Sequence, residues 1–249
     1  MGRILLLLAL MGIALAVQAP AWLLARNLED RSDGALSLRN AAGTVWRGEA
    51  DAAIRGQPAA RRDHALGRLA WRVEGIDWSR RALRVTVRQP PAGAPPATLA
   101  LGAERIRFAG SVRLPAAAAG RHRLLAGWAL GGEVSFDSEG LEWADGGATG
   151  TVTALWRNAT LAPPDLPAGF ALGEVTARIA LGGAASAVSL RNSGGDVEIS
   201  GDGSAQSGKI ALLLQPRAGA TPAQTAWLQS HTMGRTPRGY AVETGWPGR

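Results

Sequence analysis

Alternation of apolar and polar residues dominates the chain after its first 25 residues. In residues 69–73, 83–87 and 106–114, every second residue is apolar or glycine, and the residues between them are Arg or small residues. Because successive side chains of a strand point to opposite faces of a sheet, this period predicts antiparallel strands with one apolar and one wet face. Shorter alternating segments predict further strands at residues 134–136, 175–181, 188–190, 197–199, 210–214 and 240–246.

Short polar and glycine-rich stretches predict the connections between these strands. Residues 145–147 (DGG), 192–195 (NSGG) and 201–203 (GDG) have the composition of tight hairpin turns. The proline-rich residues 89–97 predict a loop, because proline cannot donate to the ladder of a central strand. Residues 116–126 are expected to form a short helix or a loop.

A helix signal follows the last internal strand. Thr221, Pro222 and Gln224 provide an N-cap hydroxyl, a proline at the first helical position and an amide at the third, which together make a capping box. Gly234 is expected to end this helix. The sequence therefore predicts a helix over residues 222–233 that docks on the sheet through Trp227 and Leu228.

The first 25 residues have a different pattern. Residues 4–25 (ILLLLALMGIALAVQAPAWLLA) are apolar except for Gln18, with Pro20 as the other interruption, and Arg3 precedes them. A helix of ~20 apolar residues spans a bilayer core. We therefore expect residues 1–25 to be a retained transmembrane helix with a cytoplasmic N-terminus, Trp22 at its outer interface, and residues 26–249 exported.

A cleaved signal peptide is the alternative interpretation of this segment. Ala14-Leu15-Ala16 and Ala19-Pro20-Ala21 both have the small residues of a cleavage site. The apolar character continues through Leu24, beyond the point where a signal peptide's apolar region ends, and a cut at Ala19 would leave proline directly after it. Both features favour the retained anchor.

Composition narrows the class of protein. The 249 residues are 46% hydrophobic and 19% charged, which is typical of a globular chain of one or two domains. The absence of Cys excludes disulfides, thiolate nucleophiles and Cys-ligated zinc.

The net charge of +7 raises the question of whether the chain binds nucleic acid. The Arg residues are dispersed along the strands and no nucleic-acid-binding motif is present, so no nucleic-acid partner is expected. The nine Trp include two at inward strand positions, Trp71 and Trp246, which we interpret as core residues.

No constellation of catalytic or metal-binding residues emerges from the sequence. The three histidines, His64, His122 and His231, are far apart and lack metal-ligand spacing. Residues 194–196 and 201–203 resemble calcium loops only faintly, and hairpin turns are the favoured interpretation. No nucleophile elbow, phosphate loop or dinucleotide motif is present. We therefore expect no enzyme activity, no catalytic residue, no cofactor, no metal and no small-molecule substrate.

Several short motifs carry a resemblance to a known family. The most specific is residues 43–48 (GTVWRG), shortly after the apolar segment; the others are residues 69–71, 150–159, 172–173, the helix at 222–233 and 238–240. Their order and spacing resemble type II secretion system protein N. The resemblance implies a single-pass inner-membrane protein with a periplasmic domain at residues 26–249. It also implies an accessory, non-catalytic subunit that contacts other inner-membrane secretion subunits.

The expected fold is mainly β: a transmembrane helix, then an elongated, curved antiparallel sheet with one short C-terminal helix. Trp46, beside two glycines in the GTVWRG motif, is expected to pack closely in a turn. A lipid-handling protein is the second functional hypothesis, since an apolar sheet face can carry acyl chains, and a periplasmic hydrolase is a weak third. An open apolar groove would favour lipid handling, and a packed core would favour the secretion scaffold.

Overall fold

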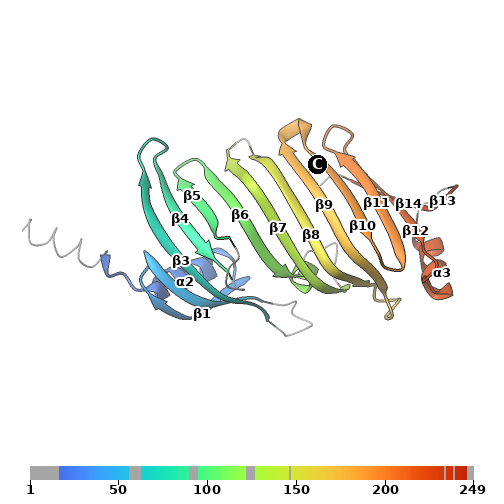
Figure 1. The fold of residues 1–249 in the computed structure, drawn as a ribbon, viewed down its shortest axis with the longest axis horizontal. Coiled ribbons are helices and arrows are strands. Elements are labelled where there is room, and N and C mark those ends of the chain that lie inside the picture. The colour runs from blue at the N-terminus through green and yellow to red at the C-terminus, as the bar shows by residue number, and fades with distance from the viewer. Residues whose placement is uncertain are drawn as a thin grey trace, which may run out of the picture. The chain divides into compact units, whose positions relative to one another are not determined.

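The computed structural model describes residues 17–55, 63–89, 95–121, 127–145, 147–232, 234–237 and 239–245. The chain forms two compact units, Met1–Leu101 and Gly102–Arg249, and both are built mainly from antiparallel strands (Figure 1). Most of the predicted anchor, residues 1–16, lies outside the described residues. Within the described part of the chain, no helix has the length and apolar character needed to cross a membrane.

The described residues of the first unit form one helix and five strands. The strands are adjacent in chain order, and β1 to β4 pair antiparallel. The elements are α2 (Ala21–Arg31), β1 (Leu36–Gly43), β2 (Arg47–Ile54), β3 (His64–Asp77), β4 (Ala82–Arg88) and β5 (Ala97–Gly102).

Helix α2 begins directly after Pro20, whose extended backbone caps it, and it runs across the boundary expected between residues 25 and 26. Its two buried residues, Ala21 and Ala25, have small side chains that allow the helix to lie close to the sheet. Ala21 joins a core cluster with Ala50 and Trp71. Helix α2 therefore covers part of the apolar face of this unit, beside β1 and β2.

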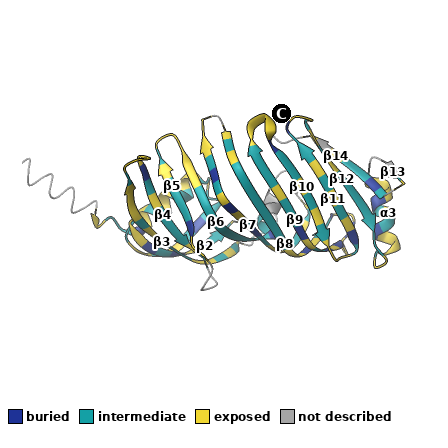
Figure 2. Cartoon of the chain, turned by 45° about the horizontal axis from the view of Figure 1, so that its top comes forward, coloured by how far each residue is buried: buried dark blue, intermediate teal, exposed yellow. Residues whose placement is uncertain are grey.

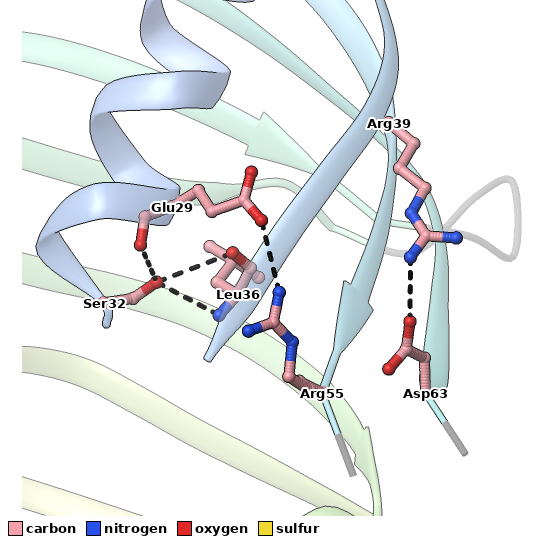
Figure 3. A network of polar contacts seen from close by, with 6 residues as sticks. All are labelled: Glu29, Ser32, Leu36, Arg39, Arg55 and Asp63. Atoms are coloured by element: carbon pink, nitrogen blue, oxygen red, sulfur yellow. Dashed lines mark hydrogen bonds and ion pairs between the residues drawn. The ribbon is translucent and has the colours of Figure 1, made fainter. Parts of the chain in front are cut away.

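Polar contacts fix the end of α2 (Figure 3). The Ser32 hydroxyl donates to the Glu29 carbonyl at 3.1 Å and accepts from the Leu36 amide at 3.1 Å, which turns the chain into β1. Arg55 pairs with the Glu29 carboxylate at 3.5 Å. The last turn of the helix is thus tied to the sheet on its exposed side.

The second unit contains nine strands and one α-helix among the described residues. Strands β6 to β12 follow chain order, and the sheet ends in the order β12-β14-β13. The elements are β6 (Ile106–Pro115), η1 (Ala116–Arg121), β7 (Ala129–Ala144), β8 (Gly147–Ala162), β9 (Phe170–Gly182), η3 (Gly183–Ala185), β10 (Ala187–Ser193), β11 (Val197–Ser204), β12 (Lys209–Pro216), α3 (Pro222–His231), β13 (Gly234–Thr236) and β14 (Gly239–Gly245).

The register of these strands aligns apolar residues into rows across the sheet. Trp156 is opposite Val175, and two strands further on Ile199 is opposite Leu214, which faces Tyr240. The residues that alternate with these, such as the exposed arginines of β8, β9 and β10, belong to the other face. Figure 2 shows exposed residues alternating with more buried ones along several strands. The prediction of antiparallel strands with one apolar face is confirmed. The buried core of the second unit is a cluster of Ala159, Leu166, Phe170, Leu172, Val175, Val197, Leu228 and Tyr240.

The C-terminal helix has the predicted capping box. The Thr221 hydroxyl accepts from the Gln224 amide at 3.2 Å, and the Gln224 side chain accepts from the Thr221 amide at 2.7 Å. Leu228 is 2% exposed and docks on the sheet as expected. The prediction that Gly234 ends the helix is wrong. The helix ends at His231, because Thr232 is extended and its hydroxyl donates to the Leu228 carbonyl at 2.8 Å.

The turn predictions are partly correct. The connections at residues 145–147 and 192–195 join adjacent strands as predicted. The prediction of a turn at residues 201–203 is wrong, because these residues lie inside β11. Gly201 is opposite Leu212, and a Cβ on Gly201 would come within 2.4 Å of the Leu212 Cδ2 atom. This glycine makes room for a large side chain on the neighbouring strand instead of forming a turn.

Candidate interaction sites

The GTVWRG motif forms the tight connection between β1 and β2. The Thr44 amide donates to the Arg47 carbonyl at 2.8 Å, and the Arg47 amide donates to the Thr44 hydroxyl at 3.2 Å. Gly43 has a φ of +90°, and a Cβ there would lie 2.5 Å from the Arg47 carbonyl oxygen. The first glycine of the motif is therefore required by the backbone of the turn.

Two other segments hold this turn in place. The Val45 amide donates to the Ala19 carbonyl at 2.9 Å, and Pro20 forms a β-bridge with Thr44. On the opposite side, the Val73 amide donates to the Trp46 carbonyl at 2.7 Å. The motif therefore attaches the chain that precedes α2 to strand β3.

The aromatic ring that packs on this motif is Trp71 and not Trp46. Trp46 is 42% exposed, whereas Trp71 is 8% exposed, as its core assignment predicted. Gly48 is opposite Trp71 in the sheet, and a Cβ on Gly48 would lie 2.5 Å from the Trp71 Cζ2 atom. The expectation for Trp46 is wrong because the contact partner of the glycine is set by cross-strand register and not by proximity in sequence.

A charged cavity of about 470 Å³ adjoins the motif. Its lining includes three arginines and two glutamates: Arg47, Arg72, Arg88, Glu49 and Glu74. Both signs of charge therefore line this cavity, with arginines in excess.

The second unit contains an apolar groove of about 650 Å³ between its sheet and α3. Strands β7 to β12 and β14 all contribute to its lining, which includes Trp156, Leu190, Leu212 and Val242. The described residues that line the groove include no Lys, Arg, Asp or Glu, and His231 is their only titratable side chain. We refer to this cavity as the apolar groove.

Helix α3 forms one wall of the apolar groove and is held there by Trp227. The Trp227 indole packs edge-on against Phe170 at 5.5 Å and stacks on the His231 ring at 4.4 Å. Its Nε1 donates to Asp165 at 2.9 Å, and this hydrogen bond, helped by the charge of His231, lowers the pKa of the Asp165 carboxyl below its usual value. His231 Nε2 lies 3.0 Å from the same carboxylate. Asp165 is not part of the groove lining, so it holds the wall from outside the groove.

Comparison with known families identifies a family that matches most of the chain. The family model for type II secretion system (T2SS), protein N, matches residues 34–240, which is more than half of the chain. The chain belongs to the protein N family. Its members are accessory components of type II secretion, so the chain takes part in protein transport. No curated protein and no solved structure matches the chain.

The matched region of the chain includes the GTVWRG turn, α3 and strands β7 to β12 of the groove lining, but it ends at residue 240, before Val242 of β14. His64 is in β3 of the first unit, and His231 is in α3 of the second. His122 and Trp246 lie outside the described residues. Within the described ranges, no group of His, Asp and Glu could hold a metal ion.

The sequence pattern placed Asn192 and Asp196 in turns and predicted no further role for them. The Asn192 amide donates to the Leu172 and Val197 carbonyls at 2.7 and 2.8 Å and accepts from the Ile199 amide at 2.6 Å. The Asp196 carboxylate accepts from the Gln224 side chain at 3.0 Å. Both join strands or helix α3 to the end of the β10–β11 hairpin. The glycines beside Asn192 and Asp196 identified the β10–β11 turn, but nothing in the local sequence indicated that these side chains bind Leu172 and Gln224.

Proposed function

We propose that this chain is a non-catalytic contact subunit of the type II secretion platform. In this proposal the apolar segment within residues 1–25 anchors the chain in the inner membrane, the remainder of the chain lies in the periplasm, and the β units bind other inner-membrane secretion subunits. The family match over residues 34–240 carries the proposal. The absence of any nucleophile, dinucleotide or phosphate-loop motif in the sequence agrees with a role that involves no chemistry.

The connection between anchor and body supports this arrangement. Ala21 and Ala25 are buried against the first unit, so the membrane span of the proposal ends near Pro20 and comprises residues 4–20. That length is at the short end of the range for a spanning helix. The hydrogen bond from Val45 to Ala19 then ties the outer end of the span to the sheet. The GTVWRG motif would thereby keep the first unit against the membrane surface.

The tip of the β3–β4 hairpin is the contact surface that we propose for a partner subunit. Trp78 is 80% exposed and Ile76 is 51% exposed. The Asp77 carboxylate accepts from the Ser79 hydroxyl at 2.6 Å and from the Arg80 amide at 3.2 Å, which orders the tip. An exposed Trp on an ordered turn beside Arg has the composition of an interaction hot spot.

Deletion of the gene that encodes the chain, followed by complementation with the intact or the mutated gene, tests this function. A strain lacking the chain should lose secretion of folded periplasmic proteins, and the intact chain should restore it. Trp78→Ala should restore it only weakly at an unchanged protein level, because the tip is outside both core clusters. Trp143→Ala, which removes another exposed Trp, is the control and should restore secretion fully. Normal secretion by the deletion strain would overturn the proposal.

Lipid handling is the second candidate function, and the apolar groove favours it. A conduit between membranes would need an open apolar face along both units. In the first unit α2 covers part of that face, beside β1 and β2, through Ala21 and its neighbour Leu24. In the second unit, residues of the buried core cluster such as Phe170 and Leu228 line the groove itself and close it on the side of α3. These features support a bound lipid more than lipid transport, so we rank the secretion role first.

A further inference from the structure

We propose that the apolar groove of the second unit binds one acyl chain of a membrane phospholipid and leaves the headgroup in water. The proposal goes beyond the secretion role and does not depend on it. It also departs from the expectation, drawn from the sequence, that no small molecule is bound. The groove's volume of about 650 Å³ is within the range of ~300–1,000 Å³ that is typical of ligand sites.

The groove is a built site with fixed walls. Leu228 is 2% exposed and holds α3 on the sheet, while Asp165 fixes the Trp227 ring beside the groove. On the floor, Leu190 and Leu212 are both opposite Gly201, and the missing side chain of this glycine leaves the space that Leu212 occupies. Strand pairing uses the backbone groups of the floor, so the floor offers an occupant apolar contacts and no hydrogen bonds.

The dimensions argue against a peptide occupant. A helix about 10 Å across with a rise of 1.5 Å per residue fills roughly 120 Å³ per residue, so fewer than ~6 residues would fill the groove. A strand binds by adding to a sheet edge, whereas the floor of the groove is the face of paired strands. A flexible hydrocarbon chain is thin enough to enter and has no polar groups to desolvate.

The lining also argues against a free fatty acid. A carboxylate inside the groove would need a cation or a donor, but the described lining residues include no Lys or Arg. His231 is already paired with the Asp165 carboxylate at 3.0 Å, which would repel a second carboxylate. The polar end of the ligand must therefore remain outside. An acyl chain attached to a large hydrated headgroup meets this requirement.

Site-specific photocrosslinking in cells tests the proposal on the full-length chain. Leu212→p-benzoylphenylalanine places a photoreactive group in the groove. Ala211→p-benzoylphenylalanine, on the next residue, places it on the opposite, exposed face. After irradiation, mass spectrometry of the purified chain should show an adduct with the mass of a diacyl phospholipid at position 212 and none at position 211.

A second variant tests whether the groove itself holds the chain. Leu190→Trp should fill part of the groove and reduce the adduct at position 212 by about tenfold. Displacing two methylene groups costs roughly 1.6 kcal/mol at ~0.8 kcal/mol each, and 1.4 kcal/mol corresponds to tenfold. Ser189→Trp, on the opposite face of the same strand, should leave the adduct unchanged. Thermal unfolding of both variants confirms that they are folded.

Four results would overturn the proposal. The first is an equal phospholipid adduct at positions 211 and 212, which would show nonspecific contact with the membrane. The second is an adduct with a protein, and the third is an adduct with free fatty acid alone. The fourth is the absence of any lipid adduct at position 212 and at a second groove position, Trp156→p-benzoylphenylalanine, in folded chains.

Discussion

The indole of Trp71 lies against Gly48 on the neighbouring strand and donates its Nε1 to the Val45 carbonyl at 3.2 Å. One side chain of β3 thus packs on the second glycine of the GTVWRG motif and binds the backbone of its turn. The same turn contacts the segment before α2, through the hydrogen bond from Val45 to Ala19 and the β-bridge between Thr44 and Pro20. The most specific motif of the sequence is therefore a structural junction between the N-terminal segment, α2 and the sheet.

Gly48→Ala should destabilise the chain by ~1–3 kcal/mol, the usual cost of overpacking. The added Cβ would lie 2.5 Å from Trp71 Cζ2 and 2.7 Å from the Ala42 carbonyl oxygen, and backbone on one side limits relaxation. Chemical denaturation measures the change. Gly245→Ala, at the end of β14, is the control, because a Cβ there meets nothing within 4 Å and its φ lies outside the left-handed region. Equal stability of the two variants would contradict the packing.

Trp71→Ala should cost ~3–5 kcal/mol, as expected for a large buried ring. Trp46→Ala should cost less than Trp71→Ala, because Trp46 is 42% exposed whereas Trp71 is 8% exposed. Both free energies of unfolding can be obtained from urea denaturation of the purified chain. If Trp46→Ala were the more costly variant, the assignment of Trp71 as the ring of the motif would be wrong.

Acidification should weaken the attachment of α3 through Asp165. The pKa of this carboxyl is lower in the folded chain than its usual value of 3.8, mainly because Trp227 donates to the charged form. Its contribution to stability is therefore fully present above the unfolded pKa and is lost as pH falls through the lower, folded pKa. Asp165→Asn removes this contribution. The difference in melting temperature between Asp165→Asn and the natural chain should be constant at neutral pH and should shrink below about pH 4. A difference that does not change with pH would contradict the role of the charge.

Sequence reasoning identified what depends on local pattern. The two-residue period found the strands, and Thr221 and Gln224 identified the cap of α3, because these signals lie within a few residues of their targets. Sequence reasoning failed where the role of a residue depends on its partner on a neighbouring strand. Gly201 looked like a turn until register placed it opposite Leu212, and Trp46 looked like the packed ring until register placed Trp71 on Gly48. Glycine has several structural uses, and composition alone does not distinguish them.

The apolar groove could not be predicted from the sequence for a similar reason. Its lining comes from β7 to β12, β14 and α3, and its volume depends on how far α3 lies from the sheet. That distance is set by Trp227 and Asp165, which are 62 residues apart in the chain. The alternating pattern revealed an apolar face but could not show that part of the face stays open.

Photocrosslinking from the hairpin tip tests the central claim most directly. Trp78→p-benzoylphenylalanine in the full-length chain, in cells with an active type II secretion system, places the reactive group on the most exposed Trp among the described residues. The contact role predicts that mass spectrometry will identify inner-membrane subunits of that system as crosslinked partners. Arg107→p-benzoylphenylalanine, on the exposed face of β6, serves as the control and should give none. Recovery from position 78 of lipid or lipopolysaccharide carriers alone, with no secretion subunit, would contradict the claim.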